Sequence, residues 1–143
     1  MAMTREDIVA MLAARHEAVA RRDLDFIAGQ HADDCEQISP LAGGTVKGRE
    51  AIRTLYETWF NGFPDLVWTS DEMLIDGDRI THVTTQSGTD TGGFMGLRPT
   101  GKPFRVPIVW IFRVKDGQFV QVRPIYDFTG LLVQIGLLRA KPA

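Results

Sequence analysis

The chain has 143 residues, about the usual size of one domain, so we expect residues 1–143 to form a single domain. With 44% hydrophobic and 24% charged residues, it can bury a core that needs neither disulfides nor metal. A formal net charge of -2 and the lack of a basic stretch argue against a nucleic-acid-binding protein. No apolar run approaches the roughly 20 residues of a membrane-spanning helix, so we expect no membrane association.

Cysteine usage and the N-terminal residues bear on the cellular compartment. Cys35 is the only cysteine, so it cannot form an internal disulfide, which is typical of a reducing compartment. Met1-Ala2-Met3 leads straight into charged residues, so we expect no signal peptide. These two features together predict a cytoplasmic protein. No histidines or carboxylates recur at a close metal-binding spacing, so we expect no metal.

The first half of the chain predicts mainly helices. Thr4 and Asp7 have the form of a capping box, and the apolar residues that follow recur at helical spacing. Asp23 is placed to cap a second, short helix. The predicted elements are helices at residues 4–21, 23–31 and 49–62, with a strand at residues 35–38 and a turn at Gly43-Gly44.

The second half predicts strands. Turn signals at residues 76–78 and 115–117 join strands into two hairpins. Residues 89–103 are rich in glycine and proline, which predicts a long loop across an open mouth. The predicted elements are strands at residues 66–75, 79–88, 104–114 and 118–126, and a short helix at residues 130–138. This order indicates an α+β fold: three N-terminal helices packed on a curved, mainly antiparallel sheet, which can close a cone around a pocket.

The order of these elements and four short motifs resemble the SnoaL-like polyketide cyclase or ester cyclase family, of the nuclear-transport-factor-2-like superfamily. The motifs are FPDL at residues 63–66, SGTDTGGFMG at 87–96, PTGK at 99–102 and YDFTGLLVQIG at 126–136. The resemblance implies a cone-shaped α+β barrel and a homodimer packed through the outer face of the sheet. It also implies cofactor-free lyase- or isomerase-type chemistry on a bulky, hydrophobic, polyketide-like substrate.

Asp127 is the leading catalytic candidate. The resemblance implies that this aspartate, near the end of the last long strand, is the acid/base. The residues support the same role, because a carboxylate after an apolar run, in an apolar pocket, becomes more basic and can remove a proton next to a carbonyl. The alternative is that Asp127 caps the closing turn near Thr129 or Gly130.

Arg123 and His82 are the other two catalytic candidates. Strand alternation puts Gln121, Arg123 and Asp127 on one side of their strand, so Arg123 could hold a substrate carbonyl or enolate. The alternative for Arg123 is a surface ion pair. His82, in the middle of a strand, could be a proton donor, although a lone histidine on a sheet is often structural.

Aromatic and polar side chains on the predicted strands and third helix could line a flat, ring-shaped cavity. Core packing explains the aromatic residues as well, and Asp90 also fits an ordinary turn. The substrate-binding candidates are Gln37, Tyr56, Trp59, Trp68, Asp90, Phe94, Trp110, Phe112, Gln121 and Tyr126. The family commonly has a histidine where this chain has Asp90, and many members have Glu and Trp where it has Gln121 and Arg123.

Three functional hypotheses follow. The first is a cofactor-independent cyclase in which Asp127 removes a proton next to a carbonyl and the enolate closes a ring by an intramolecular aldol reaction. Under this hypothesis Asp127→Asn abolishes turnover but leaves folding and binding intact. The second is another reaction in the same pocket: isomerisation, hydration, epoxide opening or cofactor-free hydroxylation. The third is a non-catalytic module that binds a hydrophobic small molecule, favoured if Asp127 bonds only to the backbone.

Overall fold

The N-terminal helices begin where the sequence predicts them. In the computed structural model, which describes residues 2–139 and 141, the three are α1 (Arg5–Ala20), α2 (Leu24–Gly29) and α3 (Arg49–Gly62). At the start of α1 the Thr4 hydroxyl accepts the Asp7 amide at 3.1 Å, and the Asp7 carboxylate accepts the Thr4 amide at 3.0 Å. This is the predicted capping box. The terminal residues 1, 140, 142 and 143 of the predicted single domain lie outside the described residues.

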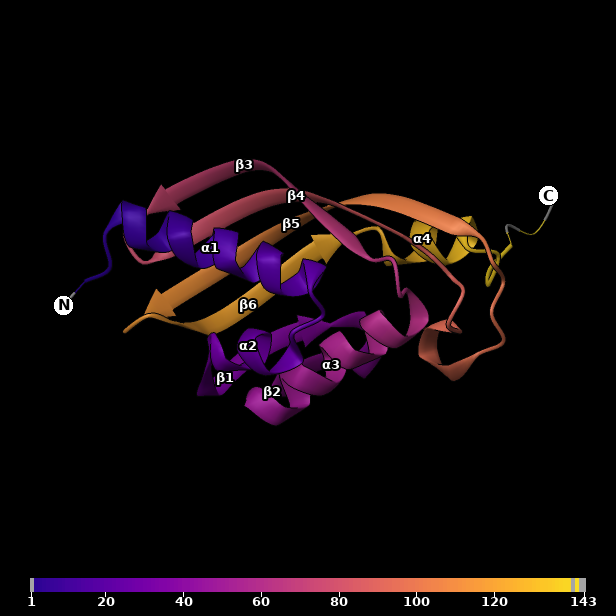
Figure 1. Cartoon of the computed structure of the whole chain (residues 1–143), viewed down its shortest axis with the longest axis horizontal. Coiled ribbons are helices and arrows are strands. Elements are labelled where there is room, and N and C mark those ends of the chain that lie inside the picture. Colours follow the sequence, from indigo (N-terminus) through magenta and orange to yellow (C-terminus); the bar gives the residue numbers. More distant parts are fainter. Residues whose placement is uncertain (1, 140, 142–143) are drawn as a thin grey trace.

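Six strands form one curved sheet (Figure 1). They are β1 (His31–Ser39), β2 (Gly44–Lys47), β3 (Val67–Asp76), β4 (Arg79–Thr89), β5 (Pro103–Lys115) and β6 (Gln118–Tyr126). Their order is β2-β1-β6-β5-β4-β3, and only the β1–β6 pair is parallel. The predicted α+β class with a mainly antiparallel sheet is therefore confirmed, as are both hairpins.

The structure differs from the predicted elements near β1. This strand covers residues 31–39 rather than 35–38, and His31 begins it instead of ending a helix. Its first half carries Asp33 and Asp34, poor strand formers. The parallel partner β6 pairs with His31 before them and with Glu36 after them, and the register shifts in between. The four residues of β2 (Gly44–Lys47) are too few to show a periodic pattern, so the sequence predicted only a turn there.

The loop of residues 90–102 packs on the end of α3 rather than crossing an open mouth. The Gly92 amide donates to the Gly62 carbonyl at 3.1 Å, and a Cβ on Gly92 would overlap the Asn61 carbonyl oxygen. Phe94, in the short 3-10 helix η2 (Phe94–Gly96), is fully buried, and its ring centroid lies 4.8 Å from that of Trp59. The loop therefore closes this end of the molecule.

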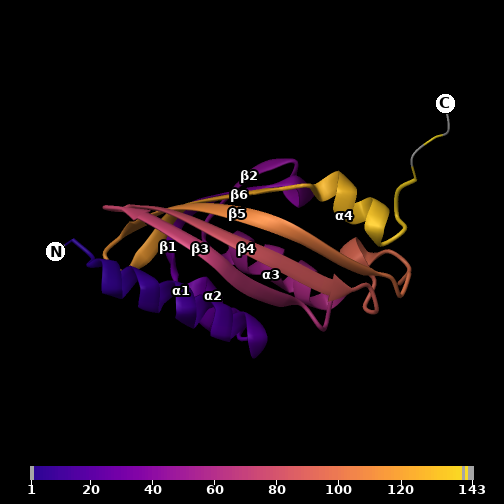
Figure 2. The same cartoon turned by 90° about the horizontal axis from the view of Figure 1, so that it is seen from above.

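Helices α1, α2 and α3 lie on one side of the sheet, and α4 (Phe128–Gln134) lies on the opposite side (Figure 2). The helix predicted at residues 130–138 begins two residues earlier and ends four residues earlier than predicted. Alternate residues of β4, β5 and β6 point towards α1–α3 and are buried, whereas their neighbours are more exposed. Among residues 2–139 and 141, no helix is both long and apolar enough to span a membrane.

Candidate functional site

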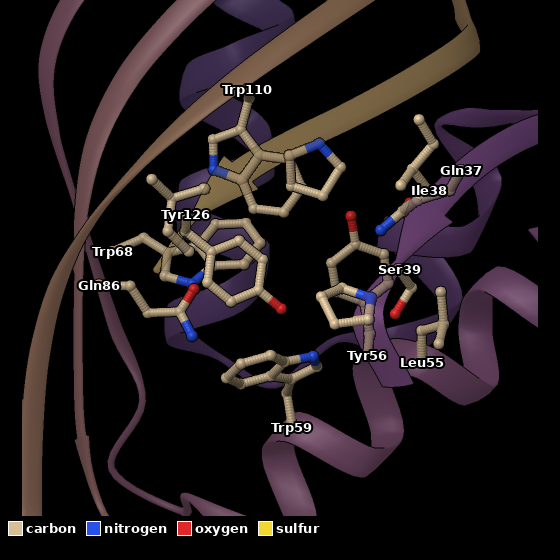
Figure 3. A pocket seen from close by; sticks show the side chains of 13 residues that line it. Gln37, Ile38, Ser39, Leu55, Tyr56, Trp59, Trp68, Gln86, Trp110 and Tyr126 are labelled. Atoms are coloured by element: carbon tan, nitrogen blue, oxygen red, sulfur yellow. The ribbon is translucent and has the colours of Figure 1, made fainter. Parts of the chain in front are cut away.

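A cavity lies between α3, the end of β1 and the inner face of the sheet (Figure 3). Six of the predicted binding residues line it: Gln37, Tyr56, Trp59, Trp68, Trp110 and Tyr126. The empty space at this site, including the part open to solvent, is about 380 Å³, but the centre of a water molecule can occupy only about 20 Å³ of it. That is room for one or two waters, so a larger ligand enters only if side chains such as half-buried Trp59 and Tyr126 move.

Aromatic rings form most of the cavity wall. The Trp68 and Trp110 ring centroids are 5.1 Å apart, and those of Trp59 and Tyr126 are 6.0 Å apart. All three tryptophans of the chain line this one cavity. Such walls fit a flat, ring-shaped ligand, because aromatic rings prefer stacked or edge-to-face contacts.

Several buried polar atoms at the cavity have no hydrogen-bond partner among the described residues. They are the Tyr56 hydroxyl, the indole nitrogens of Trp68 and Trp110, Gln86 Nε2 and Gln37 Oε1. Leaving such an atom unpaired costs about 1–3 kcal/mol, so groups of this kind normally find a partner. Most of these atoms are donors, which suits a ligand that carries carbonyl or other acceptor oxygens. Gln86 also lines the cavity; its place on an alternating strand was the signal that could have predicted it.

The two tyrosines of the cavity are hydrogen-bond donors at neutral pH. Burial raises the pKa of Tyr126 and of Tyr56, and for Tyr56 the neighbouring Arg15 and Gln37 act in the opposite direction. Both hydroxyls therefore keep their protons. In Figure 3 the Tyr126 hydroxyl points into the cavity on the side of Trp59.

The predicted apolar environment of Asp127 is wrong. Its side chain is exposed and caps α4, where Oδ1 accepts the Gly130 amide at 2.8 Å. Tyr126 points inward, so strand alternation sends Asp127 to the other face. This is the capping alternative that the sequence also allowed, and it leaves the acid/base role of Asp127 without the pocket on which that role depended.

The same alternation corrects the predictions for Arg123 and Gln121. Both are exposed on the outer face of β6, while Pro124 and Tyr126 line the cavity. The register explains the difference, because Pro124 pairs with the inward-facing Trp110. The prediction grouped Gln121, Arg123 and Asp127 on one face correctly but took that face to be the inner one; Tyr126, also predicted to bind substrate, is on the face that lines the cavity.

Asp90, Phe94 and Phe112 are buried but lie outside the cavity wall. The Asp90 carboxylate accepts four hydrogen bonds that shape the loop of residues 90–102. Phe94 fills the space beneath that loop, and Phe112 stacks on Phe119 at 4.3 Å in the core. Their predicted contact with substrate is therefore not supported by their positions.

His82 is buried beside the cavity wall rather than in the cavity. Its Nε2 lies 2.7 Å from the Ser70 hydroxyl, and its ring stacks on His16 at 4.9 Å. Burial, and then the charge of Arg15, lower the pKa of His82 to about 4 and that of His16 to about 3. Both rings are therefore uncharged at neutral pH, which does not suit His82 to the predicted role of proton donor. Among residues 2–139 and 141, no three metal-ligating side chains lie close enough together to hold an ion.

His31 makes stability depend on pH. Burial lowers its pKa to about 3, and Arg15 acts in the same direction. Between its ordinary pKa of about 6.5 and that lower value, the unfolded chain binds a proton that the folded chain does not. This residue alone should thus lower the free energy of unfolding by about 2 kcal/mol between pH 7 and pH 5. Denaturant unfolding of wild type and His31→Gln at pH 7 and pH 5 measures this contribution. If the free energy of unfolding falls by the same amount in the two proteins, the prediction is wrong.

The helices on one face of a curved, mainly antiparallel sheet give the chain a nuclear-transport-factor-2-like fold. The chain belongs to the SnoaL-like polyketide cyclase family, whose sequence model matches residues 10–135. No curated protein sequence matches the chain.

Solved structures with 25–27% identity share the whole fold. TsrD from Streptomyces laurentii has 25% identity and a TM-score of 0.83, over 95% of this chain and 99% of that chain. AclR from Streptomyces galilaeus, a proposed hydroxylase, has 27% identity and a TM-score of 0.82, over 97% of this chain and 87% of that chain. IdmH from Streptomyces antibioticus, a proposed polyketide cyclase, has 26% identity and a TM-score of 0.76, over 90% of this chain and 97% of that chain.

Proposed function

We propose that this chain is a cofactor-independent cyclase that takes a flat, hydrophobic, polyketide-like carbonyl compound into the aromatic cavity. The observation that carries the proposal is the set of unpaired buried donors, Tyr56 Oη and the indole nitrogens of Trp68 and Trp110, in a wall of aromatic rings. The rings match the shape of such a ligand, and the donors match its oxygens. Family membership supports the same reaction class.

The proposed reaction is an intramolecular aldol ring closure that needs no carboxylate base in the cavity. A compound with two carbonyls flanking one carbon already supplies its own enol or enolate. The carbon between them attacks the carbon of a third, more distant carbonyl, forming one C–C bond while that C=O π bond becomes an alkoxide. Tyr126 donates its proton to the alkoxide, and the proton that left the enol oxygen restores the tyrosine through water. Holding the two ends in contact supplies much of the rate, since orientation can contribute about 7–11 kcal/mol.

Binding without turnover is the second candidate. Two observations favour it: Asp127 caps a helix, and no carboxylate is among the described residues that line the cavity. The same aromatic walls and donors would then hold a hydrophobic metabolite. A turnover assay separates the two candidates.

The test uses a linear triketone placed for six-membered ring closure, incubated with wild type, Ile108→Trp and Val9→Trp. Ile108 lines the cavity, whereas Val9 is exposed on α1, away from both the cavity wall and the outer face of the sheet. We expect wild type and Val9→Trp to form a ring product of unchanged mass, identified by NMR, and Ile108→Trp to fall to the uncatalysed rate. Circular dichroism checks that both variants fold. Saturable binding with no product in wild type would favour the second candidate, and a raised product mass would indicate hydration or hydroxylation.

We also propose that the chain forms a homodimer through the outer face of the sheet, as its resemblance to the SnoaL-like family implies. The outer face of the sheet exposes Ile125, which is 54% accessible and pairs with Val109. Sedimentation at the mass of one chain would contradict this.

A further inference from the structure

Arg15, on α1, carries a buried charge that no acidic side chain neutralises. Its exposed fraction is 0%, and the ion pairs among the described residues involve other arginines. Its Nη1 and Nη2 atoms have no hydrogen-bond partner among those residues. Because arginine keeps its charge in proteins, this guanidinium lacks a counter-charge, and the neighbouring Tyr56 hydroxyl is close enough to interact with it but is not in good hydrogen-bond geometry.

Aromatic rings surround the Arg15 guanidinium. The centroids of Trp110 and Trp68 lie 4.5 and 4.7 Å from its central carbon, and those of Tyr56, Phe112 and Phe119 lie 5.3 to 5.6 Å away. The faces of these rings attract the cation. Ring faces are weak partners for N–H groups, however, so the rings hold the charge in place without replacing hydrogen-bond acceptors.

Three of these rings, Trp68, Trp110 and Tyr56, also line the cavity. The charge therefore lies behind this wall of rings, and Arg15 itself does not line the cavity. Its effect already reaches the surrounding groups: besides burial, Arg15 lowers the pKa of both His16 and His82, which stay uncharged and supply no negative charge.

We propose that the cavity selects an anion: a flat ring compound whose enolate or carboxylate oxygen faces the wall formed by Trp68, Trp110 and Tyr56. The ligand supplies the counter-charge that the chain does not, and its oxygens accept from the unpaired donors of that wall. A neutral ligand of the same shape would bury the Arg15 charge still further from water with nothing to balance it. This inference rests on the proposed use of the cavity, and it narrows the ligand to one charge class.

The test compares ligands of matched shape and different charge. Lawsone, a hydroxynaphthoquinone ionised at neutral pH, is paired with its uncharged methyl ether, and naphthoate with naphthamide. We expect the anion of at least one pair to bind roughly tenfold to a hundredfold more tightly to wild type, measured by tryptophan fluorescence quenching. The lawsone pair reports an enolate site and the naphthoate pair a carboxylate site. Equal binding within both pairs would overturn the proposal.

Two variants separate the buried charge from net charge. Arg15→Met keeps an unbranched side chain without the charge, and we expect it to bind both members of each pair equally. Arg5→Met removes an exposed charge from the same helix and should keep the wild-type preference. A preference that persists in Arg15→Met would overturn the proposal.

If circular dichroism shows that Arg15→Met does not fold, the proposal is tested on the wild-type protein alone. 4-Nitrophenol, a flat acid that ionises near neutral pH where the chain is folded, should keep its phenolate absorption when bound down to a pH about one unit lower than when free, and an unchanged titration would overturn the proposal. Every readout is of binding rather than turnover. Loss of the anion preference would leave ring closure standing, and failure of the cyclisation assay would leave the anion site standing.

Discussion

Asp90→Ala should lower the free energy of unfolding by about 3 kcal/mol. The buried carboxylate accepts the amides of Gly93 and Phe94 through Oδ1, at 3.2 and 3.0 Å. Its Oδ2 accepts the amide and hydroxyl of Thr100, both at 3.1 Å. Alanine leaves all of these donors without their acceptor, and the buried ones pay the desolvation cost.

Two matched variants make this prediction specific. Asp90→Asn keeps the shape and one acceptor oxygen but turns an NH₂ group towards a donor, so we expect an intermediate loss. Glu72→Ala removes an exposed carboxylate from β3 and should change stability by less than about 0.5 kcal/mol. Denaturant unfolding measures all three. A loss below about 1 kcal/mol for Asp90→Ala would mean that the loop of residues 90–102 does not depend on this carboxylate.

Tyr126→Phe should lower kcat for ring closure about 100-fold, with little change in folding. The substitution removes one hydroxyl from the cavity wall, and a single donor to a developing oxyanion is typically worth about 100- to 1000-fold in kcat. The lower end applies because Tyr56 and the indoles offer further donors nearby.

The matched control is Asp127→Asn, at the next residue. Asparagine caps helices as well as aspartate does, so α4 should remain and turnover should stay within about twofold of wild type. The sequence-based hypothesis of an Asp127 base expects the opposite. Turnover retained in Tyr126→Phe but abolished in Asp127→Asn would return the acid/base role to Asp127.

Much of the fold could be predicted because its signals are local. The capping box of Thr4, the cap of Asp23 and both hairpin turns depend on residues close in the chain, and the structure has them all. Strand β2 and the first half of β1 could not be predicted. β2 pairs with residues 36–39 of β1, and the start of β1 pairs with β6 through His31 and Phe119; no local pattern records either pairing.

The candidate site was predicted only in part, and β6 shows the reason. Alternation groups Arg123 with Asp127 and Pro124 with Tyr126, but the pattern alone does not say which group faces inward. The inner face was decided by the register with β5, which brings Pro124 opposite Trp110. The aromatic wall was predictable because large rings favour the interior wherever they occur.

Arg15 was missed although a signal was present. It lies three and four residues after Leu12 and Met11 and three before Ala18, on the buried face of α1. A charged residue on an apolar helix face usually extends to the surface, so its position alone did not indicate a buried charge. The rings that enclose it come from distant elements, among them Tyr56 of α3 and Trp110 of β5.

The most direct test of the account is an NMR titration of the indole N–H signals with lawsone. The chain has three tryptophans, and all of them line the cavity, so their three signals report on this one site. We predict that the three signals shift together and saturate with a single Kd, while the amide signals of Gly77 and Gly117 in the two hairpin turns stay in place. Saturable binding with all three indole signals unmoved would contradict a ligand site in the aromatic cavity.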